Sequence, residues 1–172
     1  MIAAGKSSDV DSCIEIAKSL PDFFTETAIT NISTELRENT FYVASVNEKI
    51  IGFVIVEPEN TESLEITWLA VDPSHQAHGI GSNLIEFVES EAKNKGFADL
   101  EVKTLAETDG DEGYQKTRKF YEKNGFKLIE VVDDYPGWDP GNPCAIFRKE
   151  FTSSDSSRRL PRRNHLGKLG SP

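Results

Sequence analysis

The segment SLEITWLAVDPSHQAHGIGSNLIEFVESEAK, residues 63–93, decides the fold of this chain because a strand, a glycine loop and a helix follow one another in it. Its first part, up to Val71, is rich in β-branched and aromatic residues and stops at Asp72-Pro73, where proline lacks the N–H that a sheet ladder needs. From Gly79 to Lys95 apolar residues recur at helical spacing, and Gly96 ends the pattern. The segment therefore predicts a strand joined to a helix by a short loop.

The start of this helix is a candidate site for an anion. The first N–H groups of a helix have no partner within it, and they lie at the positive end of the helix dipole. Gly79 and Gly81 have no Cβ, so a ligand can approach the backbone closely. The pattern is neither the Rossmann fingerprint nor a Walker loop, since no Gly-Lys-Ser/Thr follows. Taken alone, a tight turn that serves only packing explains the two glycines equally well.

Outside this segment, helical and β-rich stretches follow one another along the chain. We expect helices over about 10–20, 25–39 and 111–124, a hairpin from 41–46 and 50–57, and strands at 98–104, 126–132 and 144–151. The N-terminal MIAAGK offers little that would pair as a strand. The pattern predicts an α/β chain with a mixed sheet and no internal repeat.

Charge and composition exclude several classes of protein. The chain has 172 residues and a formal net charge of −10, which fits one domain of acidic character. Such a charge argues against a nucleic-acid partner and against an anionic membrane surface, because phosphate contacts need cations. No run approaches the ~18–20 apolar residues of a membrane helix, and the N-terminus has no apolar signal core, so we expect a cytoplasmic protein. Cys13 and Cys144 are either two lone thiols or a disulfide pair.

The charge is unevenly distributed along the chain. Residues 1–152 carry 14 basic and 28 acidic groups and are expected to form the domain, whereas residues 153–172 carry five basic groups and one acidic group. This last stretch is rich in Ser, Gly and Pro and has no periodicity, so we interpret it as a disordered basic tail. The alternatives for the tail are a vector-derived segment, a solvated end and an arm for an acidic partner.

Three motifs together resemble those of the GNAT N-acetyltransferase superfamily, over roughly residues 1–150. They are a strand ending in Ala70-Val71-x-Pro73, a loop with Gln76-x-x-Gly79-x-Gly81, and the later Phe120-Tyr121-x-x-x-Gly125-Phe126. The resemblance implies an α/β, GNAT-like fold with a mixed, largely antiparallel central sheet flanked by helices in a single domain. It also implies an acetyl-CoA-dependent N-acetyltransferase that acts on a primary amine of a small molecule or peptide. Family members often form dimers, so a homodimer is one option.

The resemblance implies a binding site for acetyl-CoA, used as a co-substrate. The loop amides would hold the pyrophosphate, and the end of the strand would hold the pantetheine arm and the thioester. The residues concerned are Leu69, Ala70, Val71, Gln76, Ala77, His78, Gly79, Ile80, Gly81 and Ser82. The chain departs from many members at Tyr114 and Thr117, where they have asparagine and alanine. With three histidines and no paired spacing, we expect no metal site.

Glu65 is the candidate general base. Amide formation requires that the amine lose a proton, that the oxyanion be stabilised and that the leaving thiolate gain a proton. In relatives a glutamate at this place acts as the base, directly or through a water, and a backbone N–H near residues 69–71 would meet the oxyanion. Strand alternation predicts that Glu65 faces away from Ile66 and Trp68. The alternative is a solvated glutamate that pairs with a neighbouring lysine.

Tyr121 is the candidate general acid. A phenol with a reference pKa near ~10 suits the protonation of a departing thiolate, and the family uses a tyrosine at this place. The alternative is an aromatic residue that packs on the sheet with Phe120 and Phe126.

Candidates for binding the acceptor amine are Tyr114, Asp134 and Trp138. Tyr114 lies seven residues before Tyr121 and therefore on the same helix face, although packing alone would explain it. Residues 133–140 combine carboxylates with aromatic rings that would receive a cationic amine, or they form a solvent-facing turn with a packed tryptophan. Two further functional hypotheses remain: a catalytically quiet CoA-binding regulatory module, and an interaction protein that uses its acidic face.

Overall fold

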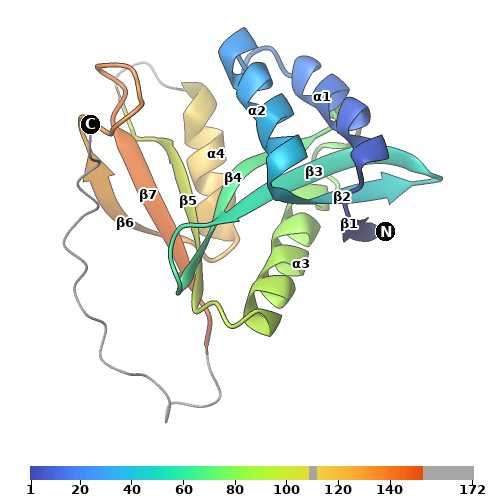
Figure 1. The fold of residues 1–172 in the computed structure, drawn as a ribbon. Helices are drawn as coiled ribbons and strands as arrows, with labels where there is room; N and C mark the ends of the chain where they lie inside the picture. The colour runs from blue at the N-terminus through green and yellow to red at the C-terminus, as the bar shows by residue number, and fades with distance from the viewer. Residues whose placement is uncertain (109–111, 153–172) are drawn as a thin grey trace.

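A computed structural model describes residues 1–108 and 112–152 (Figure 1). The expected tail, residues 153–172, and the expected start of the last helix at Asp111 lie outside the described residues. The helices are α1 (Val10–Lys18), α2 (Glu26–Glu38), α3 (Ile80–Asn94) and α4 (Glu112–Lys123), with 3-10 turns at Ser7–Asp9 and Pro73–His75. The strands are β1 (Ile2–Ala4), β2 (Thr40–Val46), β3 (Lys49–Pro58), β4 (Ser63–Val71), β5 (Asp99–Leu105), β6 (Lys127–Val132) and β7 (Cys144–Glu150).

The strands form a seven-stranded sheet in the order β1-β2-β3-β4-β5-β7-β6. β4 and β5 run parallel, joined through α3, and the other neighbouring strands run antiparallel. Helices cover both faces: α1 and α2 lie on one side of the sheet and α3 on the other (Figure 1). The predicted α/β fold, with a mixed and largely antiparallel sheet, is confirmed.

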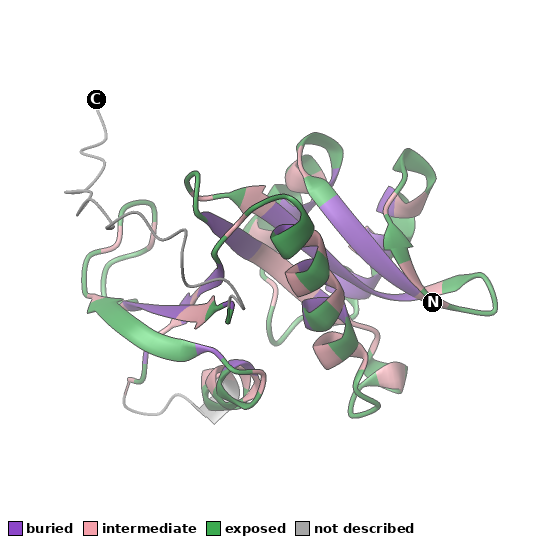
Figure 2. Cartoon of the chain, turned by 90° about the horizontal axis from the view of Figure 1, so that it is seen from below, coloured by how far each residue is buried: buried purple, intermediate pink, exposed green. Residues whose placement is uncertain are grey.

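Two apolar clusters, one on each face, hold the layers together. Under α3 and α4, Leu84, Val88 and Tyr121 pack against sheet residues such as Val54. Under α1 and α2, buried residues of the two helices pack against the opposite side of β3, at Phe53 and neighbouring positions. Figure 2 shows the buried strands behind α3, whose outer side is exposed. Because β3 alternates between the two clusters, it is buried on both faces, which explains its nearly continuous apolar sequence.

A single-residue bulge in β4 changes which face each side chain occupies. Ile55 pairs with Trp68, whereas the next residue, Val56, pairs with Ile66, so Thr67 is the extra residue. As a result Glu65 and Trp68 lie on the same face of the sheet, the face of α1 and α2, while Ile66 lies on the other. The prediction that Glu65 faces away from Ile66 is confirmed. The prediction that it faces away from Trp68 is wrong, because alternation fails across a bulge.

Three other local expectations are corrected by the structure. The MIAAGK segment does form a strand, β1, which pairs antiparallel with β2 from Ile2 opposite Ala44 to Ala4 opposite Tyr42. The β2–β3 turn consists of Asn47 and Glu48, both at positive φ, as a tight two-residue hairpin turn requires, and Lys49 already belongs to β3. Cys13 and Cys144 are separate buried thiols, so the alternative of a disulfide between them is wrong.

Among the described residues, no helix combines the length and apolarity needed to cross a membrane.

Candidate active site

The strands β4 and β5 separate halfway along the sheet. Their parallel ladder joins residues 63–66 of β4 to residues 99–102 of β5 and ends at the pair Ile66–Val102. Beyond that pair β4 continues to Val71 against β3, and β5 continues to Leu105 against β7. The bulge at Thr67 turns β4 away at this point, so the strands diverge. Among the described residues, the backbone of residues 67–70 and 103–104 on the facing edges is thereby left for another partner, such as a ligand, whereas the Val71 and Leu105 carbonyls accept hydrogen bonds from side chains.

The loop between β4 and α3 ends at Gly79, the N-cap residue of α3, which has a φ of 78°. A Cβ at this position would meet no atom within 4 Å, so the space above the backbone is open. The first bond of the helix runs from the Asn83 N–H to the Gly79 carbonyl at 2.9 Å. The N–H groups of residues 80–82 precede it and lie at the positive end of α3. This geometry suits a bound anion such as a pyrophosphate.

The rest of this loop is exposed and is tied back to the strand. Gln76, Ala77 and His78 are exposed, and the side-chain amide of Gln76 donates to the Val71 carbonyl at 3.1 Å. Ala77 has a φ of 62°, a left-handed conformation that is rare for residues with a Cβ. The loop therefore holds its shape through two left-handed residues and through side-chain contacts, which include a hydrogen bond from the Ser74 N–H to Asp72 at 2.9 Å.

Gly81 brings the three predicted motifs together. A Cβ on Gly81 would lie 3.0 Å from the ring of Phe120 and 3.7 Å from a methyl group of Leu69. The glycine loop, the end of β4 and the residue before Tyr121 thus meet at one place. At this position the glycine is needed for close packing, which the sequence left as an alternative, whereas Gly79 faces open space.

Tyr121 is buried on α4, with 6% of its surface exposed. Its ring makes edge contacts with Phe120 and Phe126, at centroid distances of 5.2 and 5.4 Å, as the packing alternative predicted. Burial raises the pKa of the phenol above its usual value, so Tyr121 stays protonated at neutral pH. Among the described residues its hydroxyl makes no hydrogen bond, and it is therefore free to donate one to a ligand. Arg118 anchors α4 by donating to the Leu105 carbonyl, at the end of β5, at 2.9 Å.

Glu65 lies on the opposite face of the sheet, in a cluster of charges. It is 9% exposed, and its Oε2 accepts a hydrogen bond from Lys103 Nζ at 2.9 Å. The same ammonium group lies 3.1 Å from Glu59 Oε2 and 3.7 Å from Glu101 Oε1. Burial raises the pKa of Glu65 to about 7, against the opposing effect of Lys103. The predicted lysine partner is confirmed, but the glutamate is buried rather than solvated.

The connection between β6 and β7 reaches this cluster through Tyr135. The ring of Tyr135 lies 5.7 Å from Lys103 Nζ, and half-buried Trp138 packs edge-on against Tyr135 at 5.8 Å. Asp134 is exposed, and Tyr114 is half-buried on α4. Of the three candidate acceptor residues, the described contacts link Trp138 to the cluster, through Tyr135.

Sequence reasoning missed Lys103, Glu59 and Glu101, and it included Tyr135 only as one of the aromatic rings of residues 133–140. The signal for two of them was present, because Asp99, Glu101 and Lys103 alternate with apolar residues in the expected strand and so share one face.

Within residues 1–108 and 112–152, no group of three or more His, Cys, Asp or Glu side chains is arranged to hold a metal ion.

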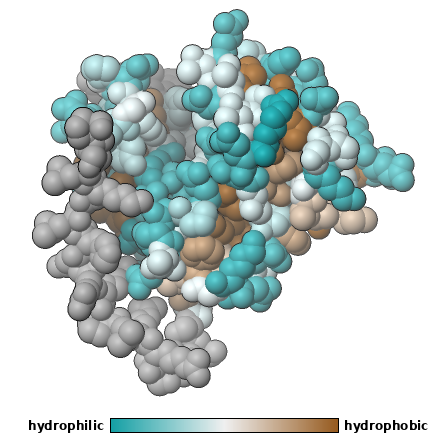
Figure 3. Space-filling view, in the orientation of Figure 1, coloured by the Kyte–Doolittle hydropathy of each residue, from teal (hydrophilic) through white to brown (hydrophobic). Residues whose placement is uncertain are grey.

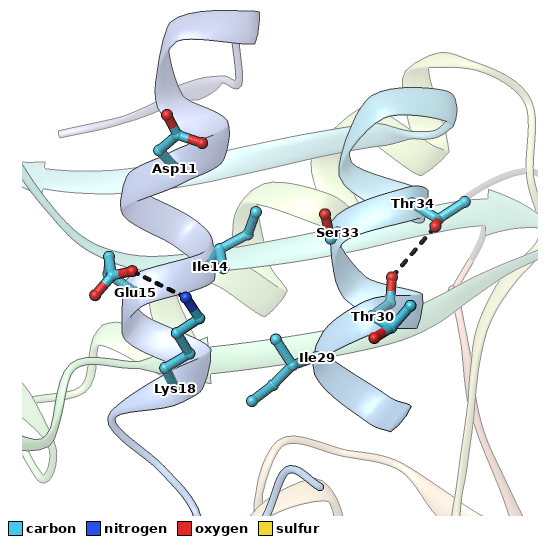
Figure 4. Close-up of a pocket in the computed structure, with 8 residues that line it drawn as sticks. All are labelled: Asp11, Ile14, Glu15, Lys18, Ile29, Thr30, Ser33 and Thr34. Carbon is cyan, nitrogen blue, oxygen red and sulfur yellow. Dashed lines mark hydrogen bonds and ion pairs between the residues drawn. The ribbon is translucent and has the colours of Figure 1, made fainter. Parts of the chain in front are cut away.

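A groove of about 630 Å³ between α1 and α2 carries none of the candidate residues (Figure 4). Ile14 and Ile29 line it together with polar side chains, among them Glu15 and Lys18, which form an ion pair at 3.4 Å. Figure 3 shows hydrophobic residues among hydrophilic ones where these helices lie. The groove is separate from the parting of β4 and β5.

Curated relatives of this chain carry the name N-acetyltransferase. An uncharacterized N-acetyltransferase of Methanocaldococcus jannaschii is 35% identical over 107 residues, which cover 59% of this chain and 43% of that protein. The uncharacterized N-acetyltransferase YsnE of Bacillus subtilis is 28% identical over 105 residues, which cover 61% of this chain and 66% of that protein. The chain therefore spans less than half of the length of the first relative and about two thirds of the length of the second.

Solved structures share the fold over nearly their whole length. A protein of Desulfovibrio desulfuricans assigned to the GNAT family of acetyltransferases superposes with a TM-score of 0.76 at 22% identity, covering 87% of this chain and 99% of that one. A GNAT family acetyltransferase of Elizabethkingia anophelis, solved with acetyl-CoA bound, has a TM-score of 0.64 at 23% identity, covering 88% and 97%. The family model for the acetyltransferase (GNAT) domain matches residues 37–128, from the end of α2 into β6. The chain belongs to the GNAT acetyltransferase family.

Proposed function

We propose that this protein is an acetyl-CoA-dependent N-acetyltransferase that moves the acetyl group to a primary amine of a small molecule or peptide. The observation that carries the proposal is the end of the β4–β5 ladder, with buried Glu65 on one face of the sheet and buried Tyr121 on the other. A base and an acid on opposite sides of one opening suit a reaction between two substrates that enter from opposite faces. The names of the curated relatives and the acetyl-CoA held by a structural neighbour support the same activity.

Acetyl-CoA would bind along Leu69–Val71 and the Gln76–Ser82 loop. The open space at Gly79 and the N–H groups at the start of α3 fit a pyrophosphate, and the facing edge of β4 beyond Ile66 fits an extended amide-containing arm. The bound thioester supplies an activated acyl carbon. The backbone N–H groups of residues 69–71 are the candidates to receive its carbonyl oxygen as negative charge develops there.

Glu65 would accept the proton of the acceptor ammonium group. A carboxylate whose pKa is raised to about 7 is both ionised and basic enough for this role at neutral pH. The neutral amine then attacks the thioester carbon and forms the C–N bond, and the C–S bond breaks as Tyr121 gives its proton to the leaving sulfur. The second proton that the nitrogen loses on becoming an amide restores the Tyr121 phenol through solvent. The raised pKa of Tyr121 keeps its proton in place until that step.

The acceptor amine would be recognised on the Glu65 face, next to the 133–140 connection. Trp138 and Tyr135 offer ring faces, and Asp134 adds an exposed carboxylate on the same connection. Tyr114 would line the acetyl-CoA side, where α4 packs. These assignments favour a cationic, amine-bearing acceptor over an anionic one.

The test has two stages, a binding measurement and a turnover measurement. Acetyl-CoA at ~100 times its dissociation constant should stabilise the fold by about 2.7 kcal/mol, seen as a rise in melting temperature. Thiol release is then followed across a panel of polyamines, amino acids, aminoglycosides and peptides with free N-termini or lysines. Binding with turnover of at least one amine supports the proposal. Binding without turnover of any amine supports the quiet CoA-binding module, and no shift at millimolar acetyl-CoA overturns both.

A further inference from the structure

Lys103 occupies a special position in the sheet. It is the first residue of β5 beyond the Ile66–Val102 pair, at the point where β4 and β5 part. Its side chain is only 10% exposed, and its ammonium group is shared among Glu65 at 2.9 Å, Glu59 at 3.1 Å and Glu101 at 3.7 Å. One cation thus faces three carboxylates at the opening where the reaction is proposed to occur.

The other charged groups around Glu65 form ion pairs or hydrogen bonds with residues other than Glu65. On β7, Arg148 binds Glu101 at 2.9 Å and lies 3.6 Å from Asp99. On β3, Glu57 is opposite Glu65 in register and accepts a hydrogen bond from Asn39 at 3.0 Å. On α2, Glu35 accepts hydrogen bonds from Thr67 and Trp68, and Tyr135 contributes a ring from the β6–β7 connection. Among the described residues, Lys103 is the cation that forms an ion pair with Glu65.

Lys103 and Glu59 act on Glu65 in opposite directions. Burial raises the pKa of Glu65, the Lys103 contact lowers it, and the nearby Glu59 carboxylate raises it again. Without Lys103, burial and Glu59 would act unopposed, and the carboxyl would keep its proton to higher pH. Without Glu59, the ammonium group would be committed more fully to Glu65.

We propose that Lys103 is a positioning residue for acetyl transfer, which holds the Glu65 carboxylate ionised and oriented at the β4–β5 opening. Glu59 opposes this effect of Lys103 on Glu65. The inference rests on the proposed function, because it assigns Lys103 a role through the proposed base. It also makes a prediction that a merely structural lysine does not: removal of Lys103 and removal of Glu59 shift the same titration in opposite directions.

The experiment is the pH profile of kcat/KM for the full chain, with the best amine of the panel and saturating acetyl-CoA. The wild-type protein should lose activity below about pH 7, where Glu65 gains its proton. Lys103→Met keeps the length of the side chain but not its charge, and should move this acid limb upward by about one pH unit. Glu59→Gln should move it downward, by less, because the Glu59 side chain is 37% exposed. Acid limbs that stay in place in both variants, or that move in the same direction, would overturn the proposal.

Two control variants separate charge from packing. Lys103→Arg keeps a cation and should leave the acid limb at the wild-type pH. Lys149→Met removes a lysine from a 2.6 Å ion pair with Glu89 at α3, away from the site, and should not shift the limb. Urea denaturation reports whether each variant is folded. If Lys103→Met does not fold, the Glu59→Gln profile decides alone, and an unshifted limb there refutes the role of Lys103.

A second measurement distinguishes failure of this inference from failure of the proposed function. The Glu65 carboxyl carbon is titrated by NMR in the wild type and in the same variants, which requires no turnover. A wild type that acetylates no amine overturns the function, and with it any catalytic role of Lys103, whatever the titration gives. A wild type that turns over while Glu65 titrates at one pH in all variants overturns the Lys103 inference alone.

Discussion

The carboxylate of Glu35 on α2 accepts a hydrogen bond from the indole Nε1 of Trp68 on β4 at 2.9 Å. Its other oxygen accepts one from the hydroxyl of Thr67, the bulge residue, at 2.7 Å. A single side chain therefore ties the α2 layer to the irregularity at which β4 leaves β5.

We expect Glu35→Ala to lower the free energy of unfolding by about 2–3 kcal/mol, because two part-buried donors lose a charged acceptor. Glu35→Gln should cost roughly half as much, since the amide oxygen can accept one of the two bonds. Urea denaturation measures both. Glu38→Ala, at an exposed position of the same helix, is the control and should stay within about 0.5 kcal/mol of the wild type. Equal losses at positions 35 and 38 would contradict the role of Glu35.

Replacing Tyr121 by phenylalanine should leave stability nearly unchanged, because the ring keeps its contacts with Phe120 and Phe126. If the hydroxyl is the general acid, kcat should fall by about 10²-fold or more while acetyl-CoA binding is retained. Steady-state kinetics and a thermal shift measure the two quantities. Tyr42→Phe, which alters another buried tyrosine in the same cluster, should keep the wild-type kcat. A Tyr121→Phe enzyme with full activity would remove the acid role.

Gly79→Ala and Gly96→Ala form a matched pair. Both glycines have positive φ, 78° and 86°, and a Cβ at either would meet nothing within 4 Å. The backbone strain should therefore cost each variant a similar amount of stability, roughly 1–2 kcal/mol. Gly79→Ala should in addition weaken acetyl-CoA binding, measured by calorimetry, because its Cβ projects into the proposed phosphate site. Equal dissociation constants in the two variants would place the phosphate elsewhere.

Glu65 should make the fold less stable as pH rises. The folded state keeps its proton up to about pH 7, whereas the unfolded chain releases it near the ordinary value of about 4.3. The unfolded state therefore binds fewer protons between these values, and stability falls by about 2 kcal/mol from pH 5 to pH 8 on account of this group. In Glu65→Gln this part of the fall should disappear, so that the variant gains on the wild type at pH 8. Urea midpoints at the two pH values test it.

The control for this effect is Glu89, whose pKa is shifted in the opposite direction. Burial opposes the shift, but Lys149 and Lys93 lower the pKa of Glu89 below its usual value. Glu89 is then ionised in both states over most of this range, so Glu89→Gln should change stability by a similar amount at pH 5 and pH 8. A wild-type protein with the same stability slope as Glu65→Gln would show that Glu65 is not protonated in this range.

The local parts of this fold could be predicted from the sequence. The helix expected from Gly79 to Lys95 is observed as Ile80–Asn94, because apolar spacing and flanking glycines are properties of adjacent residues. The three motifs that resembled the GNAT family meet in space, with Gly81 against both Leu69 and Phe120. Features that adjacent residues determine can therefore be predicted from the sequence alone.

The parts that depend on distant pairing were not predictable. MIAAGK forms β1 because the edge of β2, some forty residues away, offers it a ladder. Thr67 looks like any other strand residue, and only the register with β3 reveals it as a bulge. Lys103 belongs to none of the three motifs. It reaches Glu65 because β5 pairs in parallel with β4, which the sequence alone does not reveal.

The bulge at Thr67 changes the relation between residue number and sheet face along β4. Before Thr67, even-numbered residues lie on the face of α3 and odd-numbered residues on the face of α1 and α2. After Thr67, the even-numbered and odd-numbered residues have exchanged faces. Deleting this one residue would remove the bulge and leave every other side chain on its present face, because Ile66 and Trp68 would then follow one another opposite Val56 and Ile55. Both substrate sides of the strand would keep their linings, but β4 would lose the irregularity at which it leaves β5, and with it the opening proposed to hold both substrates.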